Sequence, residues 1–252
     1  KCVKALENNH LLLVYESMGK IWIEKSTNNG STWVLGNGGK PISTATAKHP
    51  SISQVGEHKF VIVYQKLNFG GSFNIVASYY NLYVDDIKDE KIVAERLDKE
   101  FSDEATVVIG NSRTGLTDFL IVWHEEFYGG LSPEGGLYYR LGRITTNPDN
   151  PYGIIEFLTN GFIGSTSASS VNPTIACKDE QIYYPIKFHL VWQNNVSSSA
   201  STIQYREITY NGQQLTLGTE QMLSNGSGYT KNHNPSTTVM NDNIPRVTWR
   251  GE

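Results

Sequence analysis

The stretch His49 to Gln65, HPSISQVGEHKFVIVYQ, reads as a short strand, a turn and a longer apolar strand. Pro50 opens it and Tyr64 nearly closes it, 14 residues later. Two later segments repeat this proline-to-aromatic step, with offsets of 14 and 19 residues: Pro235 to Trp249 and Pro173 to Trp192. A hairpin loop absorbs the five extra residues at little cost, so the spacing predicts a repeated structural unit.

Five apolar runs end on an aromatic and then a polar residue. They are His10 to Glu16, Lys59 to Gln65, Asp118 to His124, Phe188 to Gln193 and Pro245 to Arg250. Their aromatic residues are Tyr15, Tyr64, Trp123, Trp192 and Trp249, separated by 49, 59, 69 and 57 residues. A third strand is predicted after each of the first four runs, from about Lys20, Asn74, Gly136 and Thr202, and a weaker fourth strand follows each of these.

Four antiparallel strands repeated in this way predict an all-β chain, a β-propeller of four-stranded antiparallel blades. We expect one domain over residues 1–252, with four full repeats plus a partial fifth. The repeats are predicted at about 1–48, 49–103, 104–170, 171–233 and 234–252. A two-sheet sandwich could share the strand count, but it would not need the repeated proline-to-aromatic spacing.

The composition excludes some classes of partner. The net charge is -4 at a pI near 5.9 without a run of Lys or Arg, which argues against nucleic acid. No segment approaches 18 consecutive apolar residues, so no membrane insertion is predicted. Cys2 and Cys177 are compatible with one long-range disulfide or with two separate thiols.

The segment Lys20 to Trp33, KIWIEKSTNNGSTW, sets a strand against a tight polar turn. An Asn side chain can accept hydrogen bonds from backbone amides two residues on, and Gly30 can adopt the positive φ that such a turn needs. Trp33 is expected to fold back and bury its ring between neighbouring blades. These properties predict a structural turn and not a catalytic one.

This turn resembles the Asp-box (BNR repeat), Ser-x-Asp-x-Gly-x-Thr-Trp, of sialidase-like propellers. The matching positions are Ser26, Asn28, Gly30, Thr32 and Trp33, and Asn28 stands where the family usually has Asp. Together with the stretch from His49 to Gln65, this turn carries a resemblance that covers essentially the whole chain. The chain resembles secreted bacterial propellers, especially those of Bacteroidetes-type secretion systems. It implies a secreted or cell-surface location and a structural box at the blade periphery. The neutral Asn28 makes a metal site there less favourable.

A sialidase-like enzyme would need three converging arginines, a Tyr-Glu nucleophile pair and an acidic proton donor. Arg140 and Arg206 occupy the same place in their repeats, which predicts outward surface residues and not a substrate clamp. The family's arginine-Ile-Pro motif is absent. His124, Glu125 and Glu126 follow a central strand, but adjacent strand residues point to opposite sides, and we expect a solvated loop. No catalytic residue, cofactor or metal ligand is predicted.

The loops between second and third strands are the candidate ligand-binding elements. Leu67 to Asn74 and Glu125 to Gly136 carry Phe69, Phe73, Phe127 and Tyr128 beside glycines. Such aromatics suit sugar stacking or protein contact, or they pack into the next blade; the sequence leaves both open.

We therefore hypothesise a non-catalytic secreted or cell-surface propeller that acts as a binding or assembly module for a glycan or a protein. The alternative is a sialidase-like glycoside hydrolase. The fifth repeat reaches only its second strand, which would have an unpaired edge. We accordingly expect the 252 residues to be part of a longer polypeptide, or the strand Pro245 to Arg250 to pair with another chain or a second copy.

Overall fold

The computed structural model describes most of the chain. The described residues are 2–5, 10–56, 58–95, 102–110, 117–127, 134–147, 150–163, 169–178, 184–224, 228, 230–240 and 242–252. Side chains are described for all of these except 2–5, 102–110, 117, 126–127, 134–135, 147, 150 and 169. Within these ranges no helix is long and apolar enough to cross a bilayer.

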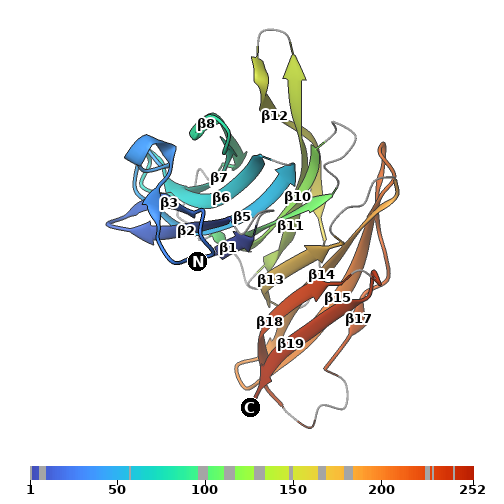
Figure 1. Cartoon of the computed structure of the whole chain (residues 1–252). Helices are drawn as coiled ribbons and strands as arrows, with labels where there is room; N and C mark the ends of the chain where they lie inside the picture. The colour runs from blue at the N-terminus through green and yellow to red at the C-terminus, as the bar shows by residue number, and fades with distance from the viewer. Residues whose placement is uncertain are drawn as a thin grey trace.

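The strands form five antiparallel sheets that follow one another along the chain (Figure 1). The first contains β1 (Cys2–Ala5), β2 (Leu11–Ser17), β3 (Lys20–Ser26) and β4 (Val34–Leu35), followed by the short 3-10 helix η2 (Asn37–Gly39). The second contains β5 (Ala47–Gly56), β6 (Lys59–Leu67), β7 (Phe73–Asn81) and β8 (Asp86–Ala94). The third contains β9 (Ser102–Gly110), β10 (Thr117–Phe127), β11 (Glu134–Asn147) and β12 (Asn150–Phe162).

The fourth sheet contains β13 (Ser169–Cys177), β14 (Ile186–Ser197) and β15 (Ala200–Tyr210), with the outer position shared by β16 (Leu215–Leu217) and β17 (Gln221–Met222). The fifth contains β18 (Asn232–Val239) and β19 (Pro245–Gly251). Strands are paired in chain order, except that β17 joins β15 beside β16. The chain is all-β as predicted, and the bounds and number of the repeats stay predictions.

The register of the second and third strands is the same in the first four sheets. In each, the polar residue after the aromatic lies opposite a fully buried aliphatic residue. The four pairs are Glu16 with Ile21, Gln65 with Ile75, His124 with Leu137, and Gln193 with Ile203. Because one residue of slippage would turn every side chain to the other face, this agreement confirms the alignment of the repeats.

The proline step is a β-bulge in the innermost strand. His49, Asn172 and Asn234 have φ values of 54°, 51° and 50°, and each precedes a proline. The register shifts at these positions in β5, β13 and β18. Proline fits a bulge because it has no N–H to contribute to the ladder, and Asn tolerates the left-handed conformation better than most residues.

Three hydrophobic cores lie between consecutive sheets. Leu12 and Val14 of the first sheet pack with Phe60 of the second. Val61 of the second packs with Phe119 of the third. Leu120 and Val122 of the third pack with Phe188, Leu190 and Trp192 of the fourth. Successive residues of a second strand therefore pack in turn against the preceding and the following sheet, which explains why these strands are apolar on both faces.

The innermost strands contact one another in series, from β1 to β5, β9, β13 and β18, and Figure 1 shows this succession of sheets. No contact of comparable extent joins β18 back to β1 among the described strands. Closure of the series into a ring, and the total number of blades, remain predictions.

Candidate functional site

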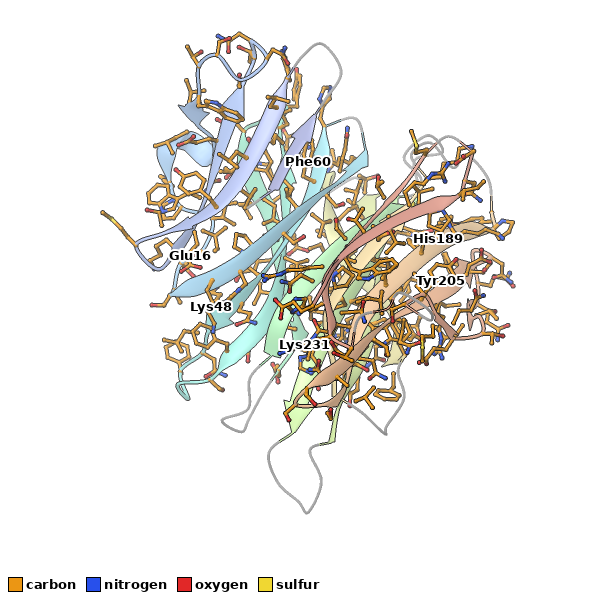
Figure 2. The ribbon with its side chains drawn as sticks, turned by 90° about the horizontal axis from the view of Figure 1, so that it is seen from below. Glu16, Lys48, Phe60, His189, Tyr205 and Lys231 are labelled. Carbon is orange, nitrogen blue, oxygen red and sulfur yellow. The ribbon has the colours of Figure 1, made fainter. Side chains whose placement is uncertain are left out.

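Polar residues of the second strands, each directly after the aromatic, lie toward the same end of the sheets as the bulges of the innermost strands. We call this set the bulge cluster: Glu16, His49, Gln65, His124, Asn172, Gln193 and Asn234. The clearest signal for it is the polar residue that follows the aromatic in each repeat. Figure 2 labels Glu16 of the first sheet and Lys48 of the second, the residue before His49, in the same part of the view.

Members of the bulge cluster link neighbouring sheets. The backbone N–H of His49 donates to Glu16 Oε2 at 3.4 Å. Gln193 Oε1 accepts from Asn172 Nδ2 at 3.1 Å and from the backbone N–H of Asn234 at 3.4 Å. At the bulges of His49 and Asn234 the backbone N–H points toward the preceding sheet, where a side chain of that sheet accepts it. These accepting side chains therefore have a structural role.

Gln65, a member of the cluster, has unused hydrogen-bonding capacity. Its side chain is 1% exposed, and its Nε2 has no hydrogen-bond partner among the described residues. A buried amide nitrogen without a partner costs free energy, which a hydroxyl, a carbonyl or water at that place would recover. Gln65 also lies opposite Lys48 in the ladder of β5 and β6, so an amide and an ammonium group share this edge.

An exposed aromatic projects from the same edge, two residues beyond the end of β6. Phe69 is fully exposed on the turn that joins β6 to β7. Asn68 fixes this turn, because its Oδ1 accepts from the backbone N–H groups of Gly70 at 2.9 Å and Ser72 at 3.1 Å. The turn is therefore ordered while its phenyl ring is open to solvent.

The other predicted loop aromatics have different positions. Phe73 is half-buried, and the Lys48 ammonium lies 4.6 Å from its ring centroid. This cation–π contact places Lys48 beside the turn that carries Phe69. The side chain of Phe127 and the whole of Tyr128 lie outside the described residues, so their predicted role is not tested.

His124 and Glu125 are not in a solvated loop, contrary to the sequence-based expectation. Both lie within β10, with exposed fractions of 1% and 9%. Glu125 Oε1 accepts from the indole N–H of Trp123 at 3.0 Å. The strand continues past the aromatic because β11 pairs with it as far as Phe127. The side chain of Glu126 is outside the described residues.

The turn from Ser26 to Trp33 is held by its own side chains. Ser26 Oγ accepts from the backbone N–H of Gly30 at 2.9 Å, and Asn28 Oδ1 accepts from that of Thr32 at 2.9 Å, four residues on. Asn28 Nδ2 donates to Thr32 Oγ1 at 2.8 Å. Gly30 has the positive φ, 85°, that the turn requires.

Trp33 is half-exposed instead of buried between sheets as predicted, because its indole folds over its own turn and donates to the Gly30 carbonyl at 3.1 Å.

The five arginines whose side chains are described all have partners. Arg140 donates to the Val93 carbonyl of the preceding sheet, and Arg206 donates to the Ile163 carbonyl and to Glu220. Both are half-buried ties between sheets, so the prediction of outward surface residues is wrong. The other pairs are Arg143 with Asp118, Arg246 with Asp242 and Arg250 with Glu252. None of the five forms part of a convergent carboxylate clamp.

Asp118 forms the most extensively bonded of these pairs, and sequence reasoning identified neither of its partners. The carboxylate is 1% exposed and accepts from Arg143 Nε at 2.5 Å, Arg143 Nη2 at 3.2 Å and the Tyr184 hydroxyl at 2.5 Å. Burial, with the hydrogen bond to Asp118, raises the pKa of Tyr184 to about 12, so Tyr184 is a protonated donor at neutral pH. No local pattern connects residues 118 and 184.

A second titratable pair, His189 and Tyr205, lies on the face of the fourth sheet. His189 Nδ1 is 2.9 Å from the Tyr205 hydroxyl, and the two rings are stacked (Figure 2). Burial lowers the pKa of His189, which favours the neutral imidazole. Lys187 and Glu207 form an ion pair at 3.0 Å nearby on the same two strands.

The described side chains include no group of three or more His, Cys, Asp or Glu residues that could hold a metal ion. Cys177 Sγ lies 3.4 Å from the Lys178 carbonyl oxygen, and the side chain of Cys2 is outside the described residues.

No protein-family model matches this chain, and a search of curated proteins finds no match in sequence. Solved structures do match. A protein of unknown function from Dyadobacter fermentans DSM 18053 aligns with a TM-score of 0.58 at 9% identity, covering 98% of this chain and 73% of that one. An α-L-arabinofuranosidase from Fusarium graminearum, in complex with an iminosugar inhibitor, aligns with a TM-score of 0.54 at 11% identity over 98% and 73%.

The intramolecular trans-sialidase from Ruminococcus gnavus aligns with a TM-score of 0.54 at 10% identity, covering 91% of this chain and 45% of that one. Identities this low concern the fold and not the activity. The chain is thus an all-β protein whose structural neighbours are β-propellers of the glycoside-hydrolase and sialidase type.

Proposed function

We propose that this chain is a non-catalytic carbohydrate-binding β-propeller module that takes neutral glycans at the edge formed by the β6–β7 turn and the bulge cluster. The observation that carries the proposal is Phe69, a fully exposed ring on an ordered turn. A fixed aromatic face binds the apolar face of a sugar ring with little loss of side-chain entropy.

Polar groups of β5 and β6, before the turn that carries Phe69, suit hydroxyl groups. Gln65 Nε2 is a donor without a partner among the described residues, and Lys48 lies beside the same turn. Amides recognise hydroxyls as both donors and acceptors, and a site with unpaired buried donors rewards a ligand that supplies acceptors. The structural neighbours named above include carbohydrate-active enzymes, which supports a glycan as the ligand.

The partners of the arginines favour neutral over acidic sugars. Arg140, Arg143 and Arg206 are occupied by other groups of the protein, so freeing them for a sugar carboxylate would break contacts between or within sheets. Hydrolysis of a glycosidic bond commonly uses two carboxyl groups across the scissile bond. Glu125, the buried acid at this edge, is held by the Trp123 indole, which supports binding without turnover.

The test is a titration of the purified protein with arabino- and xylo-oligosaccharides and with sialyllactose, followed by calorimetry, alongside a fluorogenic glycoside screen. We expect saturable binding of a neutral oligosaccharide, no binding of sialyllactose and no turnover. Phe69→Ala should weaken binding about tenfold or more, because it removes the stacking face.

Gln213→Ala, on an exposed turn of the fourth sheet, is the matched control and should bind as the wild type does. Turnover that disappears on Glu125→Gln would favour the sialidase-like or another glycoside hydrolase instead. Binding that is unchanged in Phe69→Ala would refute the site. Secretion or display at the cell surface remains part of the proposal and is tested by fractionating cells that express the natural gene.

A further inference from the structure

The turn between β2 and β3 holds an apolar residue in a conformation that disfavours it. Ser17 pairs with Lys20, so Met18 and Gly19 form a two-residue hairpin turn, with φ values of 52° and 68°. Such turns most often contain Asn-Gly or Asp-Gly, because both central residues need a positive φ. Every other described residue with a positive φ is Asn, Asp, His or Gly, so Met18 is an exception in this chain.

Packing does not explain the methionine at this position. The side chain of Met18 is 96% exposed, so it fills no space in a core. The left-handed conformation has a free-energy cost for most residues with a Cβ, which Gly avoids and Asn reduces. An exposed apolar side chain that is kept in a strained conformation indicates a role in contacts outside the fold.

A backbone bridge connects the β2–β3 turn to the β6–β7 turn, which carries Phe69. The Gly19 carbonyl accepts from the Ala47 N–H at 2.8 Å, and the Thr46 carbonyl accepts from the Leu67 N–H at 2.8 Å. The path along these bonds places the tips of the two turns at most about 25 Å apart. The two turns therefore belong to one continuous edge of the first and second sheets.

The bridging segment between the two tips carries hydroxyl groups. Thr44 and Thr46, just before β5, are both exposed. The ammonium group of Lys20, beside this segment, donates to the Thr44 carbonyl at 2.8 Å. Hydroxyls flanked by two apolar tips suit an uncharged chain of sugar rings. The apolar faces of the rings can contact the tips, and the sugar hydroxyls can form hydrogen bonds between them.

We propose that Met18 is a second subsite of the glycan site, so that the protein binds a linear, neutral oligosaccharide that lies across the first and second sheets. This inference rests on the proposed function, in which Phe69 is the first subsite. A disaccharide contacts one tip, whereas a hexasaccharide is long enough to contact both. The second contact then acts at a high effective concentration, so affinity rises with the length of the sugar chain.

The test measures how affinity depends on chain length, by calorimetry on the whole protein. The probes are the disaccharide and the hexasaccharide of the series, xylo- or arabino-, that binds in the titration above. We expect the hexasaccharide to bind about tenfold or more tightly than the disaccharide. Met18→Asn should remove most of that gain and leave the affinity for the disaccharide within about twofold, because only the second apolar contact is lost. Met18→Leu keeps an apolar side chain and should bind both probes as the wild type does.

Thermal unfolding without sugar separates a binding role from a structural one. Asn suits the positive φ, so Met18→Asn should raise the melting temperature by about 2–4 °C while it weakens hexasaccharide binding. Loss of a merely structural residue would not improve stability and impair binding together. Met240→Asn, at another exposed methionine, in the turn between β18 and β19, is the matched control and should change neither affinity.

The outcomes distinguish this inference from the proposed function. Equal affinities for the two probes, or hexasaccharide binding that Met18→Asn leaves unchanged, would overturn the second subsite and leave Phe69 as the first. A protein that binds neither probe would overturn the proposed function and this inference with it. A melting temperature that Met18→Asn does not raise would refute the argument from strain. Self-association that Met18→Asn abolishes in sedimentation would assign Met18 to a contact between copies and overturn the subsite.

Discussion

Replacing Asp118 by asparagine is expected to lower the free energy of unfolding by about 3 kcal/mol. Asp118 lies at the start of β10, is 1% exposed, and accepts three hydrogen bonds, two from Arg143 and one from Tyr184. Tyr184 lies just before β14, so the carboxylate joins the third sheet to the fourth.

The magnitude follows from what asparagine can replace. Each hydrogen bond to a charged group contributes about 1.5–3 kcal/mol, and removing one partner of a buried ion pair costs about 3–5 kcal/mol. The amide has one acceptor oxygen, and its NH2 group would face the donors of Arg143. The Arg143 side chain is 20% exposed, so water recovers part of the lost interaction and the low end of the range applies.

The assay is guanidinium denaturation at neutral pH, followed by circular dichroism and by tryptophan fluorescence. Tyr184→Phe, which removes one donor, should cost about 1–2 kcal/mol, and the double variant should be less destabilised than the sum of the single variants. A loss below about 0.5 kcal/mol for Asp118→Asn, or strict additivity with Tyr184→Phe, would show that the contact does not stabilise the junction of the sheets.

Three further substitutions test other parts of the structure. Asn28→Asp should leave the melting temperature nearly unchanged, because a carboxylate still accepts from the Thr32 amide and can accept from the Thr32 hydroxyl. Asn28→Ala should lower the free energy of unfolding by about 1 kcal/mol. Equal melting temperatures for the two variants would contradict this prediction. Burial lowers the pKa of His189, so the unfolded chain binds a proton more readily than the folded chain and stability falls as pH drops below about 6.5. His189→Gln should make that fall shallower in urea titrations, and an unchanged slope would exclude His189 as its cause. Gly142→Ala should lower the free energy of unfolding measured in urea by about 1–3 kcal/mol, because a Cβ at this position would lie 2.4 Å from the Phe119 ring. An unchanged free energy of unfolding would show that the Phe119 ring moves aside without cost.

The strands and their register were predictable because the repeats are local. The step from Pro50 to Tyr64 contains a bulge, a turn and a strand within one short segment, and the segments from Pro173 and Pro235 repeat it. The polar residue after the aromatic was also visible as a pattern. Its role as a link to the bulge of the next sheet was not, because that contact joins residues such as Glu16 and His49 through tertiary packing.

Other features depended on packing that single-sequence patterns do not encode. Tyr184 reaches Asp118 across 66 positions in the chain, and no periodicity connects them. His124 and Glu125 are buried because the partner strand β11 extends beyond the aromatic, which the length of the preceding apolar run did not indicate. Trp33 folds over its own turn, where its indole N–H donates to the Gly30 carbonyl, a contact that the spacing of the turn residues did not indicate.

The three cores between sheets also imply a graded resistance to opening. The second and third sheets each contribute to two cores, while the first and fourth contribute to one and the two-stranded fifth to none among the described residues. In repeat proteins each unit is held by its own pairing and by its packing against neighbours, so cooperativity weakens toward units that contribute to fewer cores. Amide protons of β6 and β10 should exchange with solvent only through global unfolding, and those of β18 and β19 through local opening of the last hairpin.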